Sequence, residues 1–175
     1  PDEVGLMETV VRQFGLARFV LKVTAGGDTR QASVLNGLQA LPEDADIVMI
    51  HDGARALVTE DVITRALQSA VEHGSGVASV AVENTIKRVD KDNGVIETLD
   101  REKLRAMQTP QAFRVELIKQ AHDMARRDGF ISTDDAALLE HAGLRVFVTE
   151  GSRRNIKLTT ALDLLLADAI LEGED

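Results

Sequence analysis

Residues 47–55 read Ile-Val-Met-Ile-His-Asp-Gly-Ala-Arg, a short apolar run that stops at an acid, a glycine and an arginine. Such a run is typical of a buried parallel strand whose end lies at the rim of an α/β sheet, where polar side chains become available. We therefore expect a strand over residues 46–51, with Asp52 and Arg55 at the rim.

A second polar segment, Gly26-Gly27-Asp28-Thr29-Arg30-Gln31-Ala32-Ser33, opens a helical pattern over residues 29–41. Glycine allows a tight turn, and the N–H groups at a helix N-terminus can point at a phosphate or a nucleotide. Together with the segment at Asp52, this suggests an enzyme that handles nucleotides. The same Gly-Gly-Asp letters are also compatible with a plain turn between a strand and a helix.

Strands and helices alternate along the rest of the chain. Helices are expected over 3–14, 29–41, 60–73, 115–127 and 160–171, with a short helix that begins at 132–135 and ends at Gly143; strands are expected over 18–23, 46–51, 76–82 and 145–149. This order predicts an α/β fold with a mostly parallel sheet flanked by helices.

The alternation breaks at two strand-like runs, 85–90 and 95–99, on either side of Lys91-Asp92-Asn93-Gly94. That four-residue segment is a strong signal for a hairpin turn. Because an isolated hairpin is marginal in water, it must lie on something. It could fold back on its own sheet or reach a second subunit as an arm, and we favour an arm at about residues 84–105.

Composition limits the class of protein. With 175 residues and 44% hydrophobic content, the chain is expected to form one domain over residues 1–175. A net charge of −9 and 3% aromatic residues argue against nucleic acid as a partner, although Arg153, Arg154 and Lys157 form a local basic cluster. No run approaches the roughly 18 apolar residues of a membrane span, so no membrane partner is expected. The lack of cysteine excludes disulfides and thiolate metal sites and fits a reducing cytoplasm.

With these residues placed, the chain resembles the 2-C-methyl-D-erythritol 4-phosphate cytidylyltransferase family from about Gly26 to Ala169. Seven segments in the family's order carry the resemblance: Gly26-Gly27-Asp28-Thr29-Arg30 with Ser33-Val34, His51-Asp52-Gly53-Ala54-Arg55, Asn84-Thr85-Ile86-Lys87-Arg88, Leu99-Asp100-Arg101, Gln108-Thr109-Pro110-Gln111, Thr133-Asp134-Asp135 and Asn155-Ile156-Lys157-Leu158-Thr159. The resemblance implies a Rossmann-like nucleotidyltransferase sheet with a hairpin arm that clasps a second subunit in a homodimer. The implied reaction joins the phosphate of methylerythritol phosphate, a sugar-alcohol phosphate, to the α-phosphorus of CTP and releases pyrophosphate with the help of Mg²⁺.

The resemblance also implies roles for individual residues. Arg101 and Lys157 would be catalytic and would position the acceptor phosphate; Gly26, Gly27, Asp28 and Ser33 would recognise the cytidine; Asp52 would hold Mg²⁺ or a ribose hydroxyl; and Arg55, Thr85 and Thr109 would bind substrate. Because the nucleophile is already an anionic phosphate oxygen, it needs orientation and charge neutralisation more than deprotonation.

Plainer interpretations stand beside these roles. Asp52 could cap N–H groups of its own turn, and Arg55 could be a solvated loop residue. Arg101 could be a surface charge beside acidic neighbours, whereas Lys157 has no acid near it in sequence. If Arg101 and Thr85 lie on an arm, they could complete the site of the other subunit, and activity would then require the dimer.

The four histidines carry little signal. His51 is expected to pack at the end of its strand, and His73, His122 and His141 are expected to be surface or capping residues. No two histidines have the i, i+4 spacing of a metal pair on one helix, so a histidine metal site is not expected.

Family members begin with a strand and a glycine-rich loop that carries an arginine and a lysine, and no part of this sequence matches that segment. We therefore expect that these 175 residues alone do not turn over CTP. Ribitol 5-phosphate is the alternative acceptor. A chain that is natively this short would instead be a non-catalytic dimeric binding module, and membership of a bifunctional chain is left open.

Overall fold

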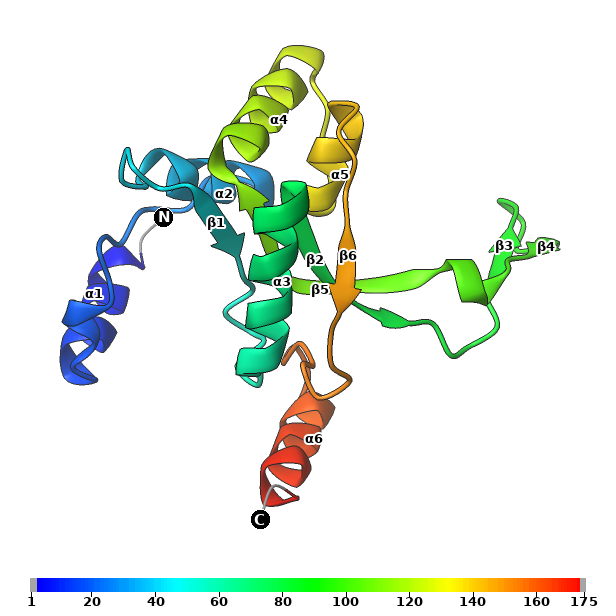
Figure 1. Cartoon of the computed structure of the whole chain (residues 1–175). Coiled ribbons are helices and arrows are strands. Elements are labelled where there is room, and N and C mark those ends of the chain that lie inside the picture. The colour runs from blue at the N-terminus through cyan, green and yellow to red at the C-terminus, as the bar shows by residue number, and fades with distance from the viewer. Residues whose placement is uncertain (1–2, 174–175) are drawn as a thin grey trace. The chain divides into compact units, whose positions relative to one another are not determined.

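The computed structural model describes residues 3–173 and divides into two compact units (Figure 1). The first unit holds the described residues up to Val48 together with Arg114–Arg145. Its helices are α1 (Val4–Gln13), the 3-10 turn η1 (Leu16–Arg18), α2 (Arg30–Gln39), α4 (Val115–Asp128) and α5 (Asp135–His141). The helices α4 and α5 pack on each other and α2 packs on α4, burying Leu38, Ile118, Leu138 and Leu139.

The second unit holds Met49–Phe113 and the described residues from Val146 onward. Its elements are α3 (Glu60–His73), β2 (Ser75–Ala81), β3 (Lys87–Val89), β4 (Val95–Thr98), the 3-10 turn η2 (Arg101–Lys103), β6 (Val148–Glu150) and α6 (Ala161–Glu172), together with most of β5 (Arg105–Arg114) and the end of β1 (Ile47–Ile50). These bounds lie within a few residues of the predicted helices and of the strands predicted at 46–51, 76–82 and 145–149.

A four-stranded sheet runs in the order β1-β5-β2-β6. Strand β6 pairs parallel to β2, and β5 pairs antiparallel to it, with Ser75 opposite Phe113. Helix α3 packs on β2 and β6, and a Cβ at Gly76 would lie 2.1 Å from the Ala66 carbonyl oxygen, so glycine permits this close approach. The predicted α/β class with a helix-flanked sheet is confirmed.

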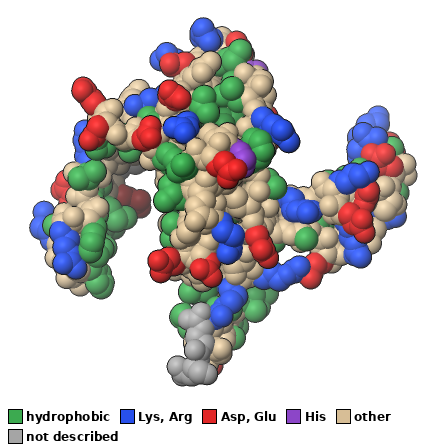
Figure 2. Space-filling model, viewed as in Figure 1, with side chains coloured by type: hydrophobic (Ala, Val, Ile, Leu, Met, Phe, Trp, Pro, Cys, Tyr) green, Lys and Arg blue, Asp and Glu red, His purple; other side chains and the backbone are tan. Residues whose placement is uncertain are grey.

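The predicted hairpin is also confirmed. Strands β3 and β4 pair antiparallel, and the Asp90 carboxylate accepts the N–H groups of Asp92 and Gly94 in the turn. Asn93 adopts a left-handed φ of 62°, as such turns require. The strand residues are exposed, and the hairpin extends away from the sheet with charged side chains of both signs on its surface (Figures 1 and 2).

Two predictions about strands were wrong. Residues 18–23 form no strand: Arg18 belongs to η1, Leu21 is 85% exposed, and no described residue pairs with this run. An apolar run becomes a strand only when a neighbour satisfies its backbone groups. Strand β5 was missed because its buried part begins with polar residues and contains Pro110, which cannot donate to a ladder.

Helix α6 begins with the predicted capping box, in which the Thr160 and Asp163 side chains bond to each other's backbone N–H groups. Leucines of this helix remain largely exposed, among them Leu162, Leu164, Leu165 and Leu166. Figure 2 shows apolar side chains gathered in this part of the molecule. No helix among residues 3–173 is long and apolar enough to cross a membrane.

Candidate functional site

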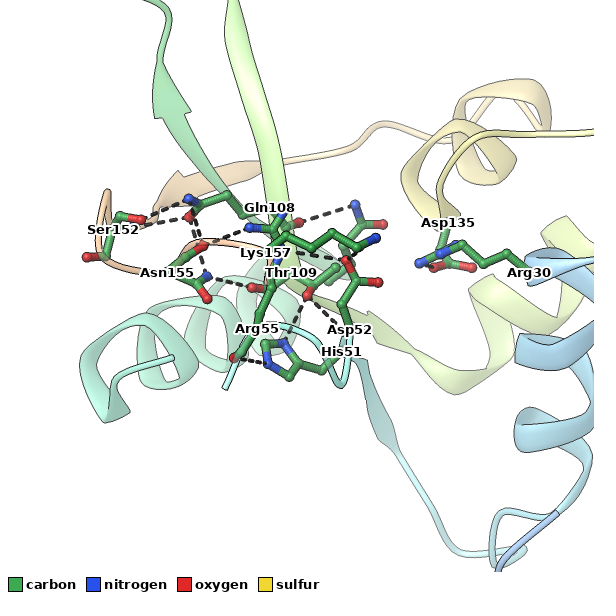
Figure 3. A network of polar contacts seen from close by, with 11 residues as sticks. Arg30, His51, Asp52, Arg55, Gln108, Thr109, Asp135, Ser152, Asn155 and Lys157 are labelled. Carbon is green, nitrogen blue, oxygen red and sulfur yellow. Dashed lines mark hydrogen bonds and ion pairs between the residues drawn. The ribbon is translucent and has the colours of Figure 1, made fainter. Parts of the chain in front are cut away.

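In the second unit, a carboxylate and two cationic side chains meet where β1 ends (Figure 3). Lys157 Nζ lies 3.1 Å from Asp52 Oδ2, and Arg55 Nε lies 3.5 Å from the same oxygen. The Asp52 and Arg55 side chains are mostly buried, whereas that of Lys157 is 47% exposed. Two cations around one carboxylate leave an excess of positive charge that faces solvent through the Lys157 ammonium, an arrangement suited to binding phosphate.

Arg55 also contacts the segment that carries Lys157. Its Nη1 donates to the Asn155 carbonyl at 2.7 Å, and the Leu158 N–H donates to the Ala54 carbonyl at 2.8 Å. The loop after β1 is therefore bonded directly to the segment that carries Lys157. Asp52 and Lys157 are far apart in the sequence. The acidic partner of Lys157 is therefore seen only in the fold and not among its neighbours in the sequence.

Two buried side chains, Gln108 on β5 and Asn155, connect this segment to the sheet (Figure 3). Gln108 donates to the Ser152 carbonyl at 2.8 Å and accepts from the Ser152 N–H at 3.2 Å. Asn155 Nδ2 donates to the Thr109 carbonyl at 2.8 Å. A Cβ at Gly151 would lie 2.3 Å from Gln108 Oε1, so this contact requires glycine. These bonds fix the segment that carries Lys157 against β5.

The Thr109 hydroxyl and the His51 ring join the same network. The Asp52 N–H donates to Thr109 Oγ1 at 3.0 Å, and Thr109 Oγ1 lies 3.0 Å from His51 Nδ1. His51 Nε2 lies 3.1 Å from the Arg55 carbonyl oxygen. His51 thus lies at the strand end as predicted, but with both ring nitrogens engaged in polar contacts.

Arg101 and Thr85 lie apart from this cluster. Arg101, on η2 at the base of the hairpin, donates through Nη1 to the Glu83 carbonyl, and both Arg101 and Thr85 are exposed. Within the part of the chain that the structure describes, no hydrogen bond or ion pair joins either of them to Asp52 or Lys157. Their expected role in the site of a second subunit remains a prediction.

The first unit carries the glycine turn. Thr29 caps α2 by accepting the Ala32 N–H at 3.1 Å, and Ser33 Oγ accepts the Gly27 N–H at 3.0 Å while it donates to the Thr29 carbonyl. A Cβ at Gly27 would lie 2.5 Å from that of Ala32, so only glycine fits there. The hydrogen bonds of the Thr29 and Ser33 side chains therefore hold the turn against the start of α2.

A cavity of 330 Å³ opens beside this turn, lined by Glu3, Val4, Met7, Val23, Thr24, Gly26, Gly27 and Ser33. The Asp28 side chain is exposed. The turn and the Asp52 cluster belong to different units, and the expectation that both handle a nucleotide remains a prediction.

Arg30, the first residue of α2, forms an ion pair of 2.6 Å with Asp135, whose side chain is fully buried. His122 is also buried, with Nε2 4.0 Å from Asp135 Oδ1. Burial raises the pKa of Asp135, against the opposing effect of Arg30, and burial lowers the pKa of His122. The prediction that His122 is a surface or capping residue was wrong, because it lies on the face of α4 that packs against α5. The same expectation is confirmed for His73 and His141, which are the last residues of α3 and α5.

The structure therefore brings together four of the predicted site residues, namely Asp52, Arg55, Thr109 and Lys157, and in the other unit Gly26, Gly27 and Ser33. Sequence reasoning missed Gln108, Asn155 and the bonding role of His51. Each of these lies inside a segment quoted for the resemblance, which was the available signal. Within residues 3–173 no group of three or more His, Asp or Glu side chains could hold a metal ion.

Comparison with known proteins agrees with the resemblance. The chain is 45% identical over 172 residues to 2-C-methyl-D-erythritol 4-phosphate cytidylyltransferase of Thermosynechococcus vestitus, an alignment that covers 98% of this chain and 73% of that protein. The corresponding protein of Nostoc sp. is 51% identical over 151 residues, covering 86% of this chain and 66% of its own length. The chain thus spans about two thirds to three quarters of the length of these relatives.

A solved structure of 4-diphosphocytidyl-2C-methyl-D-erythritol synthase from Anaerococcus prevotii superposes with a TM-score of 0.84 at 27% identity, covering 98% of this chain and 78% of that one. The family model described as 2-C-methyl-D-erythritol 4-phosphate cytidylyltransferase matches residues 2–173. The chain therefore belongs to the 2-C-methyl-D-erythritol 4-phosphate cytidylyltransferase family.

Proposed function

We propose that the natural protein transfers the cytidylyl group of CTP to the phosphate of 2-C-methyl-D-erythritol 4-phosphate. An acceptor phosphate oxygen bonds to the α-phosphorus of CTP while the bond from that phosphorus to pyrophosphate breaks, which yields CDP-methylerythritol and pyrophosphate. The observation that carries the proposal is the meeting of Lys157 and Arg55 at Asp52 in a chain of this family.

The chemistry asks for positioning and charge neutralisation, since the attacking oxygen is already anionic. Lys157 supplies an ammonium that is half exposed and fixed by Asp52, so it can meet phosphate without first being ordered. Arg55 is more buried and is engaged by Asn155, so we assign it mainly to holding the loop that presents Asp52.

Asp52 fits Mg²⁺ as one carboxylate ligand. Mg²⁺ is commonly held by one or two carboxylates together with substrate phosphates, so a lone aspartate beside a triphosphate is a sufficient protein contribution. When bound, the ion would neutralise charge on the phosphates. Lys157 and Arg55 keep the Asp52 carboxylate in place at the end of β1.

We assign recognition of the cytidine to the glycine turn. Its support is that the turn is pre-formed by Thr29 and Ser33 and lies beside a cavity. The backbone of Gly26 and Gly27, and the side chain of Asp28, are the groups available for this task. Because Ser33 Oγ already bonds to the turn, we assign it to holding the turn's shape as well as to binding.

We further propose a homodimer in which the hairpin arm brings Thr85 and Arg101 to the partner's site. The support is an exposed, charged hairpin that extends from its sheet and carries both residues at or near its base. Mixing inactive Arg101→Ala and Asp52→Ala chains of the natural full-length protein should restore part of the activity, because one of the two sites in a mixed dimer would be intact. Failure of every mixture to regain activity would overturn the shared site.

The chain contains no cysteine, which fits a reducing compartment, and we propose that the protein works in the cytoplasm. Cell fractionation with an antibody to the natural protein tests this. Recovery in the membrane or secreted fraction would contradict it.

The function itself is tested by pyrophosphate release from CTP with methylerythritol phosphate or ribitol 5-phosphate as the acceptor. Faster turnover of methylerythritol phosphate by the natural full-length protein is the expected result. Preference for ribitol 5-phosphate would reassign the acceptor, and no release with either acceptor would overturn the enzymatic proposal.

A further inference from the structure

His51 has both ring nitrogens occupied, and the nature of its partners determines where its proton lies. Nε2 faces the Arg55 carbonyl oxygen at 3.1 Å, and a carbonyl can only accept a hydrogen bond. Nε2 must therefore carry the proton. A neutral imidazole has one such proton, so Nδ1 is left as an acceptor.

That tautomer orients the Thr109 hydroxyl. Thr109 Oγ1 is 3.0 Å from His51 Nδ1, so its single proton points at that nitrogen. The lone pairs of the same oxygen then accept the Asp52 N–H, also at 3.0 Å. Figure 3 shows these contacts, which run from Asp52 through Thr109 and His51 to Arg55. With this tautomer, each donor in the series faces one acceptor.

We propose that His51 and Thr109 act as one positioning pair that fixes the loop bearing Asp52. Thr109 is 5% exposed, and its only hydroxyl proton is committed to the ring, so its hydroxyl acts on the loop and does not donate to the acceptor phosphate. The inference rests on the proposed function, which it deepens by moving Thr109 from the substrate-binding residues to those that hold Asp52.

The loop is bonded at both ends by this pair. The Asp52 backbone is tied to Thr109 on β5, while the ring of His51 spans to the backbone of Arg55. Within this loop Arg55 pairs with the Asp52 carboxylate, and Lys157 pairs with the same carboxylate oxygen. Loss of the ring would release the loop and let the carboxylate move away from Lys157.

The kinetic test uses the natural full-length protein and four variants. His51→Leu removes both ring contacts and should lower kcat by about tenfold, with the KM for CTP little changed. His51→Asn keeps an acceptor near the position of Nδ1 and should recover most of that loss. Thr109→Val should match His51→Leu, and the double variant should be no slower than either, because the two residues act as one unit.

His73→Leu is the matched control, since His73 lies at the end of α3 and takes no part in this network. It should leave kcat unchanged. Independent, additive losses in His51→Leu and Thr109→Val would overturn the paired role, as would a His51→Leu variant with normal kcat. A Thr109→Val variant with an unchanged kcat and a raised KM for the acceptor would return Thr109 to direct substrate binding.

A spectroscopic measurement decides the tautomer without reference to activity. Nitrogen-15 NMR of the histidine-labelled natural protein, assigned with His51→Leu, should show the His51 proton on Nε2 and a hydrogen bond at Nδ1 that is lost in Thr109→Val. A proton on Nδ1 would overturn the inference. Complete lack of cytidylyltransferase activity would instead refute the proposed function, while the tautomer measurement would still test the pair.

Discussion

The glycine turn and the Asp52 cluster are built over very different distances along the chain. Hydrogen bonds in and around the turn join residues 3, 4, 6 and 11 positions apart. In the cluster, the bond from Asp52 to Thr109 spans 57 positions and that from Arg55 to Asn155 spans 100. The turn can form from its own segment, whereas the cluster exists only after β1, β5 and the segment at Lys157 have come together. Four predictions test this contrast.

The largest effect is expected at the cluster. Lys157→Ala should lower kcat for pyrophosphate release by about 100-fold, because it removes a pre-positioned cation from the developing phosphate charge. Steady-state kinetics on the natural full-length protein measures this, with Lys119→Ala on the exposed side of α4 as the matched control. Equal activity of the two variants would mean that the cluster is structural only.

The second prediction concerns the glycine turn, where an added side chain should change the shape of the backbone. Gly27→Ala places a Cβ 2.5 Å from that of Ala32, so the turn must shift; unfolding free energy should fall by about 1–3 kcal/mol and the KM for CTP should rise. Gly37→Ala, inside helix α2 and with no atom within 4 Å of the new Cβ, should gain up to about 1 kcal/mol. Urea denaturation compares the two. Stabilisation by both substitutions would show that the turn tolerates a side chain.

The third prediction concerns the burial of His122 in the first unit and its effect on how stability depends on pH. Burial lowers its pKa from 6.5, so below that pH the unfolded chain binds a proton that the folded chain does not, and stability falls as pH drops. The slope should approach at most about 1.4 kcal/mol per pH unit. Asp135 contributes with the opposite sign because its pKa is raised, so the effect of His122 is the difference between the natural protein and His122→Leu. Identical slopes in urea titrations would contradict the burial.

The smallest effect is expected at the most local feature, the capping box of α6. Thr160→Ala should cost about 1 kcal/mol, whereas Thr160→Ser should keep most of the bond. Hydrogen bonds from Thr159 and Thr160 lower the pKa of Asp163, so its stabilising effect is present above pH 3.8 and is lost as pH falls through the lowered value. Denaturation at neutral and acidic pH measures both effects. A Thr160→Ala variant as stable as the natural protein would show that the capping box does not stabilise the fold.

The comparison explains which features could be predicted. The predicted helices and the hairpin were correct because caps such as Thr29 and turns such as the one at Asn93 act between near neighbours. Strand β5 and the burial of His122 were not predicted. Strand β5 depends on pairing with β2 and His122 on packing beside Asp135, and neither partner is close in the sequence. Residues 18–23 show the converse, a strand-like pattern without a described partner.

The site divides along the same line. Motif resemblance predicted Asp52, Arg55, Thr109 and Lys157 as site residues, and the structure brings these four side chains together. The roles of Gln108 and Asn155 became visible only through contacts with Ser152 and Thr109. A polar side chain in a strand has no sequence mark that distinguishes a buried clamp from a solvent-facing residue.

The order of residues was enough to specify the helices, the hairpin, the glycine turn and the family, since each is written in short segments with characteristic spacing. Folding alone gave Lys157 its carboxylate partner and placed the Thr109 hydroxyl beside the His51 ring. An ion pair or a hydrogen bond needs two groups within a few ångströms, and for residues separated by half the chain only the packed sheet supplies that proximity.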